Sequence, residues 1–198
     1  MKIIKLAKKD VRKEMDEWYE KRTRNHIDLV GKYCRRIADK FEEFEELRER
    51  LKVHDDSKFE EPEKEAYVFI SWKYKCQDDG RDFQECNPPE NIDELMNEAT
   101  KHHILFNSHH PEFHLSEEDK KGDILNEGNR DKPPEKALEV QAIPRLDVAE
   151  MVADWVSVSE EKGNTPKSWA DKNVNVRWNF TDEQKDLIYE LIDATWED

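Results

Sequence analysis

The stretch "HIDLVGKYCRRIADKFEEF", residues 26–44, indicates the fold class because its apolar side chains recur at helical spacing. The members of this series are His26, Val30, Tyr33, Ile37, Phe41 and Phe44. Steps of three or four residues place them on one face of an α-helix. The pattern already begins near Val11, and Thr23 or Asn25 would cap a second helix if the run were broken there.

The rest of the chain has the same helical character. Further helices are predicted from about Pro62 to Lys75, from Asn91 or Asp93 to Pro111, from Leu146 to Ser159, from Thr165 and from Thr181. Pro166 suits the first position of a helix that Thr165 caps. The sequence "TDEQ", residues 181–184, has the form of a capping box. We therefore expect an all-α fold.

Length and turn content predict a single domain with one insertion. A chain of 198 residues suits one domain, which we place at residues 1–198 with a core at about 23–159. Residues 113–144 are charged and rich in turn formers, which predicts a loop-rich surface insertion. Residues 160–198 would form a C-terminal helical extension.

The composition argues against nucleic acids and membranes as partners. Charged residues make up 41% of the chain, and the formal net charge is -15. Such a protein repels a duplex phosphate backbone or an anionic membrane unless a local positive site overrides its field. A bound metal ion would supply such a site.

The cysteines and the N-terminus predict a cytoplasmic protein. Three cysteines with no CxxC pair argue against a disulfide framework or a zinc finger. The N-terminal sequence "MKIIKLAKKD" has too short an apolar run for a signal peptide. No apolar stretch approaches the length needed to span a bilayer.

Five of the seven histidines lie in "ATKHHILFNSHHPEFH", residues 99–114. On a continuous helix His103 and His110 are seven apart and share a face, and His102 and His109 form a second such pair. Neutral imidazole is the commonest metal ligand, so the cluster predicts metal binding. A polar helix end with partly buried histidines is the alternative. Spacing leaves open which member of each pair points inward.

A second candidate is "VHDDSKF", residues 53–59. His54 and the adjacent carboxylate of Asp55 can hold one metal ion, or the carboxylate can lie between two ions. Lys58 follows three residues later and would hold an anionic substrate or the charge that develops on it. Taken alone, the same residues also fit a solvated turn.

Three acidic residues follow at helical spacing in "DVAEMVADWVSVSE". Asp147, Glu150 and Asp154 are three and four residues apart, so they line one stripe of a helix. Asp154 lies inside an apolar run, where an acid must be paired, and it is the better metal-ligand candidate. Asp147 and Glu150 are alternative ligands, or members of an ordinary exposed acidic stripe.

The order of these motifs resembles the HD-domain superfamily of metal-dependent phosphohydrolases. In chain order the sequence has a helical His26, the doublet His54–Asp55, further histidines, and a helical Asp154. "VHDDSK" is similar to the HDxxK form of the doublet, with Lys58 as its lysine. "HDDSKF", "HHILFNSHHPE" and "EMVADW" more closely resemble a largely uncharacterised HD-like family of phages and bacteria. The resemblance spans roughly residues 23–159.

The resemblance implies an HD-like helical bundle that hydrolyses a nucleotide or a related small phosphate. A first metal ion would be held by His26, His54, Asp55 and Asp154. His103 and His110, or their neighbours, would hold a second ion, with Asp55 bridging the two. The cofactor would be one or two divalent ions of iron, manganese or zinc. Asn107 and Glu112 would orient the ligating imidazoles.

Two other functions fit the same residues. Some HD-like proteins hold two irons and oxidise a substrate with dioxygen, and histidine-rich ligation suits iron. A metal-containing protein that binds a nucleotide without turnover is the other alternative. The expected partner in each case is a small phosphorylated or nucleotide ligand, and the sequence leaves the oligomeric state open.

Overall fold

The computed structural model describes residues 2–121, 125, 134–140 and 143–196, with no side chains described before Val11. The chain divides into two compact units. Unit 1 consists of residues 1–25 and 56–103, and unit 2 consists of residues 26–55 and 104–198. Each unit has its own hydrophobic core.

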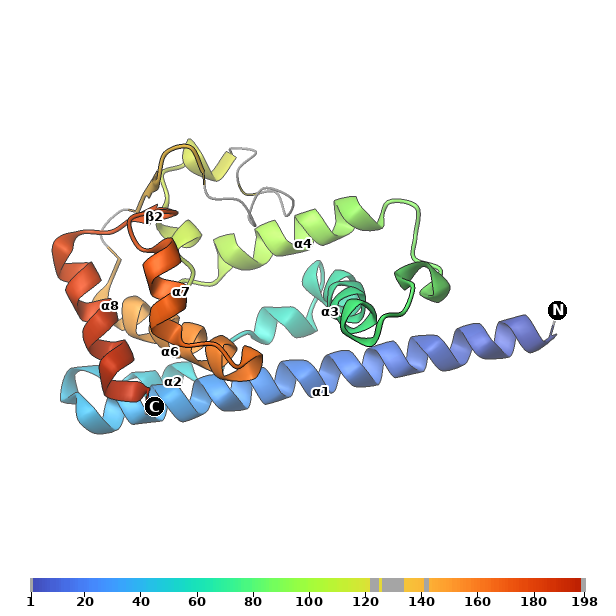
Figure 1. Cartoon of the computed structure of the whole chain (residues 1–198), viewed down its shortest axis with the longest axis horizontal. Coiled ribbons are helices and arrows are strands. Elements are labelled where there is room, and N and C mark those ends of the chain that lie inside the picture. The colour runs from blue at the N-terminus through green and yellow to red at the C-terminus, as the bar shows by residue number, and fades with distance from the viewer. Residues whose placement is uncertain (1, 122–124, 126–133, 141–142, 197–198) are drawn as a thin grey trace. The chain divides into compact units, whose positions relative to one another are not determined.

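Unit 1 is built around the N-terminal part of helix α1 (Lys2–Lys40) and helix α3 (Glu63–Asp79) (Figure 1). Its other elements are 3-10 helices η2 (Asp56–Phe59) and η3 (Phe83–Cys86) and the first part of α4 (Ile92–Phe106). The core side chains come from three helices and include Met15, Tyr19, Phe69, Trp72 and Met96. Gly80 ends α3 with a φ of 67°, which glycine adopts without strain.

Unit 2 contains the C-terminal part of α1, from His26, and helix α6 (Arg145–Lys162). Helix α6 packs against α2 (Leu47–Arg50), α7 (Pro166–Asn173) and α8 (Asp182–Thr195). The remaining elements are short: η1 (Glu42–Phe44), η4 (Pro111–His114), η5 (Asp119–Lys121), β1 (Leu138–Glu139) and β2 (Trp178–Asn179). The two strands pair in parallel, with Leu138 opposite Trp178.

The predicted all-α class is confirmed, and so are the helix starts near the C-terminus. Thr165 accepts a hydrogen bond from the Ser168 N–H and caps α7, with Pro166 at the first helical position. Thr181 and Gln184 form both hydrogen bonds of the capping box at the start of α8. The apolar face that α8 buries is Leu187, Ile188, Leu191 and Ile192.

Two local predictions need correction or comment. Helix α1 is not broken at Thr23 or Asn25, because the helical apolar spacing continues through that point to Lys40. Helix α4 ends at Phe106 rather than at Pro111, so His109 and His110 lie in the turn that follows. Asn107 and Ser108 begin that turn, and both residue types favour turns over helix interiors.

The segment 113–144, predicted as a surface insertion, also contributes to the core of unit 2. Its buried side chains include Leu115, Leu125, Val140 and Ile143. Residues 122–124, 126–133 and 141–142 of this segment lie outside the described residues. The division into a core, an insertion and a C-terminal extension stays a prediction.

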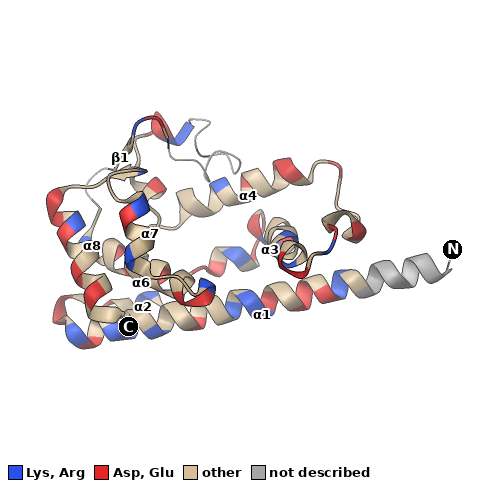
Figure 2. Cartoon of the chain, in the orientation of Figure 1, with Lys and Arg blue, Asp and Glu red and all other residues tan. Residues whose placement is uncertain are grey.

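Acidic and basic residues are interleaved along the long helices (Figure 2). Several pairs four residues apart on α1 form ion pairs, such as Arg12 with Asp16 and Arg24 with Glu20. No helix among the described residues is both long enough and apolar enough to cross a membrane.

Candidate metal centre

Four predicted ligands meet inside unit 2. His26 lies on α1, His54 and Asp55 follow α2, and Asp154 lies on α6. The His26 Nε2 atom is 3.0 Å from Asp154 Oδ1 and 3.5 Å from Asp55 Oδ2. The His54 Nε2 atom is 3.8 Å from the same Asp55 oxygen. Helices α1 and α6 therefore bring together residues that are more than a hundred positions apart in the sequence.

Asp55 occupies the centre of this group through an unusual backbone conformation. Its φ is +60°, in the left-handed region that aspartate tolerates better than most residues. The side chain is buried, with 1% of its surface exposed. Its Oδ2 atom faces His26 and His54, and its Oδ1 atom lies 3.6 Å from His109 Nε2. One carboxylate thus has imidazole nitrogens near both oxygens.

Glu150 sets the orientation of His54. The Glu150 Oε1 atom is 2.8 Å from His54 Nδ1 and 3.6 Å from His109 Nδ1. Burial would raise the pKa of Glu150, but the hydrogen bond with His54 and the neighbouring cationic groups hold it below its ordinary value. An ionised Glu150 accepts a hydrogen bond, so the His54 Nδ1 atom must donate. In the neutral ring this leaves the lone pair on Nε2, the atom that faces Asp55.

Arg50 and Asp147 surround Glu150 on its outer side. Arg50 Nε is 2.9 Å from Glu150 Oε2, and its Nη1 atom bonds Asp147. Asp147 also accepts a hydrogen bond from Ser108. Asp147 and Glu150 are both buried and paired, so they are not an exposed acidic stripe. The structure places Asp147 among supporting contacts, with His114 Nε2 3.6 Å from its carboxylate.

His26 is oriented in a similar way. Ser157 donates its hydroxyl proton to the Asp154 carbonyl oxygen, so its oxygen can accept from His26 Nδ1 at 3.4 Å. Glu161 also faces Nδ1, at 3.6 Å. Without a metal ion, Nε2 donates to the Asp154 carboxylate at 3.0 Å. With Nδ1 as the donor instead, Nε2 would be free to ligate an ion at this position.

The electrostatics of the cluster follow from burial and crowding. Burial would lower the pKa of His54, but the carboxylates of Asp55 and Glu150 raise it above its ordinary value. Burial would raise the pKa of Asp154, yet its hydrogen bond with His26 keeps it well below the usual range. Burial and the charge of His54 lower the pKa of His109 to about 4. The protein therefore keeps His109 neutral, as a metal ligand must be.

The residues present fit a metal ion. Two ligand atoms bound to one ion at about 2.1 Å lie roughly 3.0–3.5 Å apart. The nitrogen–oxygen distances around Asp55, 3.5 to 3.8 Å, lie close to that range. The His54 Nε2 atom is buried and makes no hydrogen bond within the described part of the chain. Imidazole and carboxylate donors suit iron, manganese or zinc. The chain therefore contains buried histidine and carboxylate clusters that could hold a metal ion, one of His26, His54 and Asp55 and one of His54, His109 and Glu150.

The other predicted residues lie outside these two clusters. His110 follows His109 in the turn, with ring centroids 4.4 Å apart. Asn107 accepts the backbone hydrogen bond of His110, and Glu112 is buried in η4. Lys58 belongs to unit 1, where its Nζ atom lies 5.6 Å from the ring centroid of Tyr67.

His102 and His103 also belong to unit 1, and the structure shows a partner that sequence reasoning missed. The buried carboxylate of Glu63 lies 2.7 Å from His102 Nδ1 and 2.9 Å from His103 Nδ1. Because α4 ends at Phe106, His103 and His110 do not share a face of one helix. Nothing in the sequence distinguished Glu63 as a partner of these histidines, because it follows Pro62 and is one of many glutamates in that stretch.

Fold and site define an all-α protein with a buried histidine and carboxylate cluster able to hold a metal ion. Its sequence matches the model of a family of unknown function, DUF5662, over residues 15–194. The match covers most of the chain, so the protein belongs to this family. No curated protein and no solved structure matches the chain significantly.

Proposed function

We propose that the protein is a metal-dependent phosphohydrolase that acts on a nucleotide or a related small phosphate. The observation that carries the proposal is the position of Asp55, whose two carboxylate oxygens face His26 and His54 on one side and His109 on the other. A carboxylate in that position can bridge two ions. The order of the motifs along the chain, which resembles HD-domain phosphohydrolases, gives the reaction class.

In this proposal His26, His54, Asp55 and Asp154 would hold the first ion. His109, predicted as an alternative ligand, joins the candidates for the second ion because its Nε2 atom faces Asp55; His103 and His110 stay predicted ligands. Bound divalent ions acidify water and offset negative charge on phosphoryl oxygens. Hydrolysis then forms a bond from the water oxygen to phosphorus and breaks the ester P–O bond, and the leaving oxygen takes up a proton.

Other residues of the chain position the ligands or the substrate. Glu150 and Ser157 hold the Nδ1 atoms of His54 and His26 and so fix which nitrogen can ligate. Lys58 lies in unit 1, and its role as a point charge that binds phosphate stays a prediction from the HDxxK-like motif. We expect Lys58→Ala to lower phosphate release while leaving the metal content unchanged.

The test is elemental analysis of protein purified without chelator or affinity nickel, followed by phosphate-release assays on nucleoside mono-, di- and triphosphates. We expect roughly one or two equivalents of iron, manganese or zinc. Asp55→Asn should lose metal and activity, because asparagine keeps the left-handed backbone but not the charge. Asp56→Asn is the matched control, since Asp56 is the exposed neighbour.

Absence of metal from the wild type, even after reconstitution, would contradict the proposal. Metal without phosphate release from any nucleotide would leave a binding protein. Dioxygen uptake that depends on a substrate would favour an oxygenase instead.

A further inference from the structure

Unit 2 contains a pocket that reaches the candidate metal centre. Its volume is about 360 Å³, and residues of α6, α7 and β2 and the turn at His110 line it. Asp154, one of the four predicted ligands of the first ion, forms part of its wall. This size is at the lower end of the range for small-molecule sites, so the pocket suits one small ligand.

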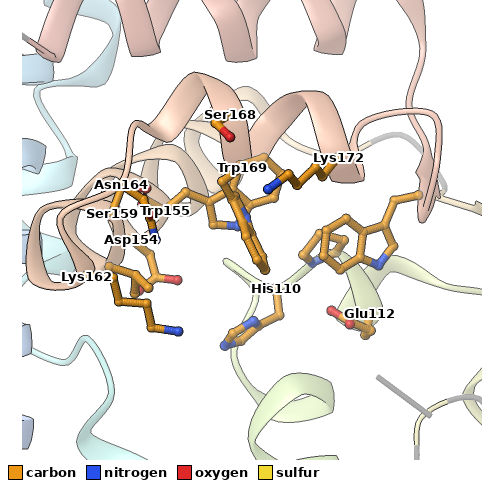
Figure 3. A pocket seen from close by; sticks show the side chains of 13 residues that line it. His110, Glu112, Asp154, Trp155, Ser159, Lys162, Asn164, Ser168, Trp169 and Lys172 are labelled. Atoms are coloured by element: carbon orange, nitrogen blue, oxygen red, sulfur yellow. The ribbon is translucent and has the colours of Figure 1, made fainter. Parts of the chain in front are cut away.

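Three of the chain's six tryptophans line this pocket. The rings of Trp155 and Trp178 are buried and stacked, with centroids 5.9 Å apart and planes inclined by 21°. Trp169 on α7 is different, because 43% of its surface is exposed. In Figure 3 its indole extends from α7 toward His110, into the space that the pocket encloses. An exposed indole in a pocket offers a face on which a planar ring can stack.

Two lysines supply positive charge at the same place. Lys162 and Lys172 line the pocket, and neither forms an ion pair with any described residue. Some other lysines of unit 2 are paired, such as Lys32 with Glu160. In a chain of net charge -15, two unpaired lysines beside a pocket favour an anionic ligand there.

The positions of these groups favour one orientation of the ligand in the pocket. Asp154, Val158 and Lys162 are four residues apart on α6 and all line the pocket. In the view of Figure 3, Lys162 lies on the same side of Trp169 as Asp154, and Glu112 lies on the other side. An anionic group is therefore favoured at the end that reaches the metal centre, and a planar group beside Trp169. The carboxylate of Glu112 can accept hydrogen bonds from amino or hydroxyl groups.

We infer that this pocket binds a nucleoside monophosphate, with its base stacked on Trp169 and its phosphate directed toward Lys162 and Asp154. The inference rests on the proposed function, because it places the phosphate at the proposed metal centre. The pocket is formed largely by residues 155–178, so α7 and β2 select the substrate that the ligands on α1 and α6 would process.

The experiment compares nucleoside 5′-monophosphates with ribose 5-phosphate, which lacks only the base. Binding is measured by tryptophan fluorescence and calorimetry, on metal-free protein and on protein reconstituted with Mn²⁺. We expect at least one nucleoside monophosphate to bind roughly tenfold or more tightly than ribose 5-phosphate, the effect of one stacking contact. Trp169→Ala should remove this difference and leave ribose 5-phosphate binding unchanged.

The controls separate the base from the phosphate. Phe106→Ala truncates another exposed aromatic residue that does not line the pocket, and it should change nothing. Lys162→Ala should weaken nucleotides and ribose 5-phosphate alike, whereas Lys167→Ala, on α7 and outside the pocket, should not. Trp169→Tyr should restore most of the preference for a base, because tyrosine also stacks.

The outcomes also separate this inference from the proposed function. Nucleotide binding that depends on Trp169, in a protein that holds no metal, would support the proposed nucleotide site and contradict the hydrolase proposal. Bound metal and release of phosphate, with no preference for nucleoside monophosphates over ribose 5-phosphate, would support the hydrolase proposal and overturn the proposed nucleotide site. Equal loss of both ligands in Trp169→Ala would also overturn it.

Discussion

At the scale of single residues, the most informative contact is the hydrogen bond between Glu150 and His54. The bond is 2.8 Å long and buried, and Arg50 holds the other Glu150 oxygen. A carboxylate in this position fixes the imidazole so that Nε2 can ligate. Glu150→Gln removes the charge and lets the amide present either a donor or an acceptor to Nδ1. We expect metal affinity to fall about 10–100-fold, measured by competition with a chelator.

Glu160→Gln is the control for this prediction. Glu160 lies on the same helix but pairs with Lys32 and Tyr33. Its substitution should leave metal affinity unchanged. Equal affinities in Glu150→Gln and wild type would mean that Glu150 does not orient a ligand.

The lowered pKa of His109 predicts one part of the pH dependence of stability in the metal-free protein. Burial and the charge of His54 lower its pKa from 6.5 to about 4. Between these values the unfolded chain binds a proton at His109 that the folded protein does not, so the contribution of His109 to stability falls as the pH drops from about 6.5 to 4. This single group accounts for a loss on the order of 2–3 kcal/mol.

The measurement is chemical denaturation of chelator-treated protein from pH 7 to pH 4.5. His109→Gln should lose less stability than the wild type over this range, because glutamine does not titrate. The groups that titrate elsewhere are common to both proteins. Parallel curves would show that His109 is protonated in the folded state at the same pH as in the unfolded chain.

At the scale of elements, α8 depends on its capping box. Thr181 accepts from the Gln184 N–H, and the Gln184 side chain accepts from the Thr181 N–H. Removal of an N-cap hydroxyl costs about 1 kcal/mol. We expect Thr181→Ala to lower the free energy of unfolding by that amount, and Thr181→Ser to have little effect. A Thr181→Ala variant as stable as wild type would indicate that packing against α6 alone holds α8.

Local signals in the sequence were sufficient for this part of the fold. Capping residues and apolar spacing predicted α7 and α8, since both signals come from neighbours within one helical turn. The predicted end of α4 was wrong by several residues, because the prediction extended the helix to the first proline after it began. The turn at Asn107 and Ser108 ends it earlier.

The candidate site, too, could be predicted from the sequence only in part. His26, His54, Asp55 and Asp154 were named from the sequence, and the structure brings them together. The partners that orient them were harder to predict. Arg50 and Ser157 are ordinary residues in the sequence, and their roles depend on contacts with side chains about a hundred or more positions away. Such contacts leave no periodic signal in a single sequence.

At the scale of the whole molecule, the cluster concentrates negative charge that the fold must offset. Asp55, Glu150 and Asp154 are packed within unit 2 of a protein whose net charge is already -15. Buried carboxylates at such distances repel one another. The groups that offset this repulsion are the partly charged imidazoles and the guanidinium of Arg50. A divalent cation would relieve this repulsion and link α1, the segment after α2, and α6.

Metal binding should therefore raise the melting temperature of the chelator-treated protein. A ligand at a concentration of 100 times its Kd stabilises the folded state by about 2.7 kcal/mol. We expect Mn²⁺, Zn²⁺ or anaerobic Fe²⁺ to produce a saturable rise in the wild type and none in Asp154→Asn. Asp171→Asn, which alters an exposed aspartate of α7, should respond as the wild type does. An equal rise in Asp154→Asn would place the stabilising ion elsewhere, because that variant lacks the α6 carboxylate that faces His26.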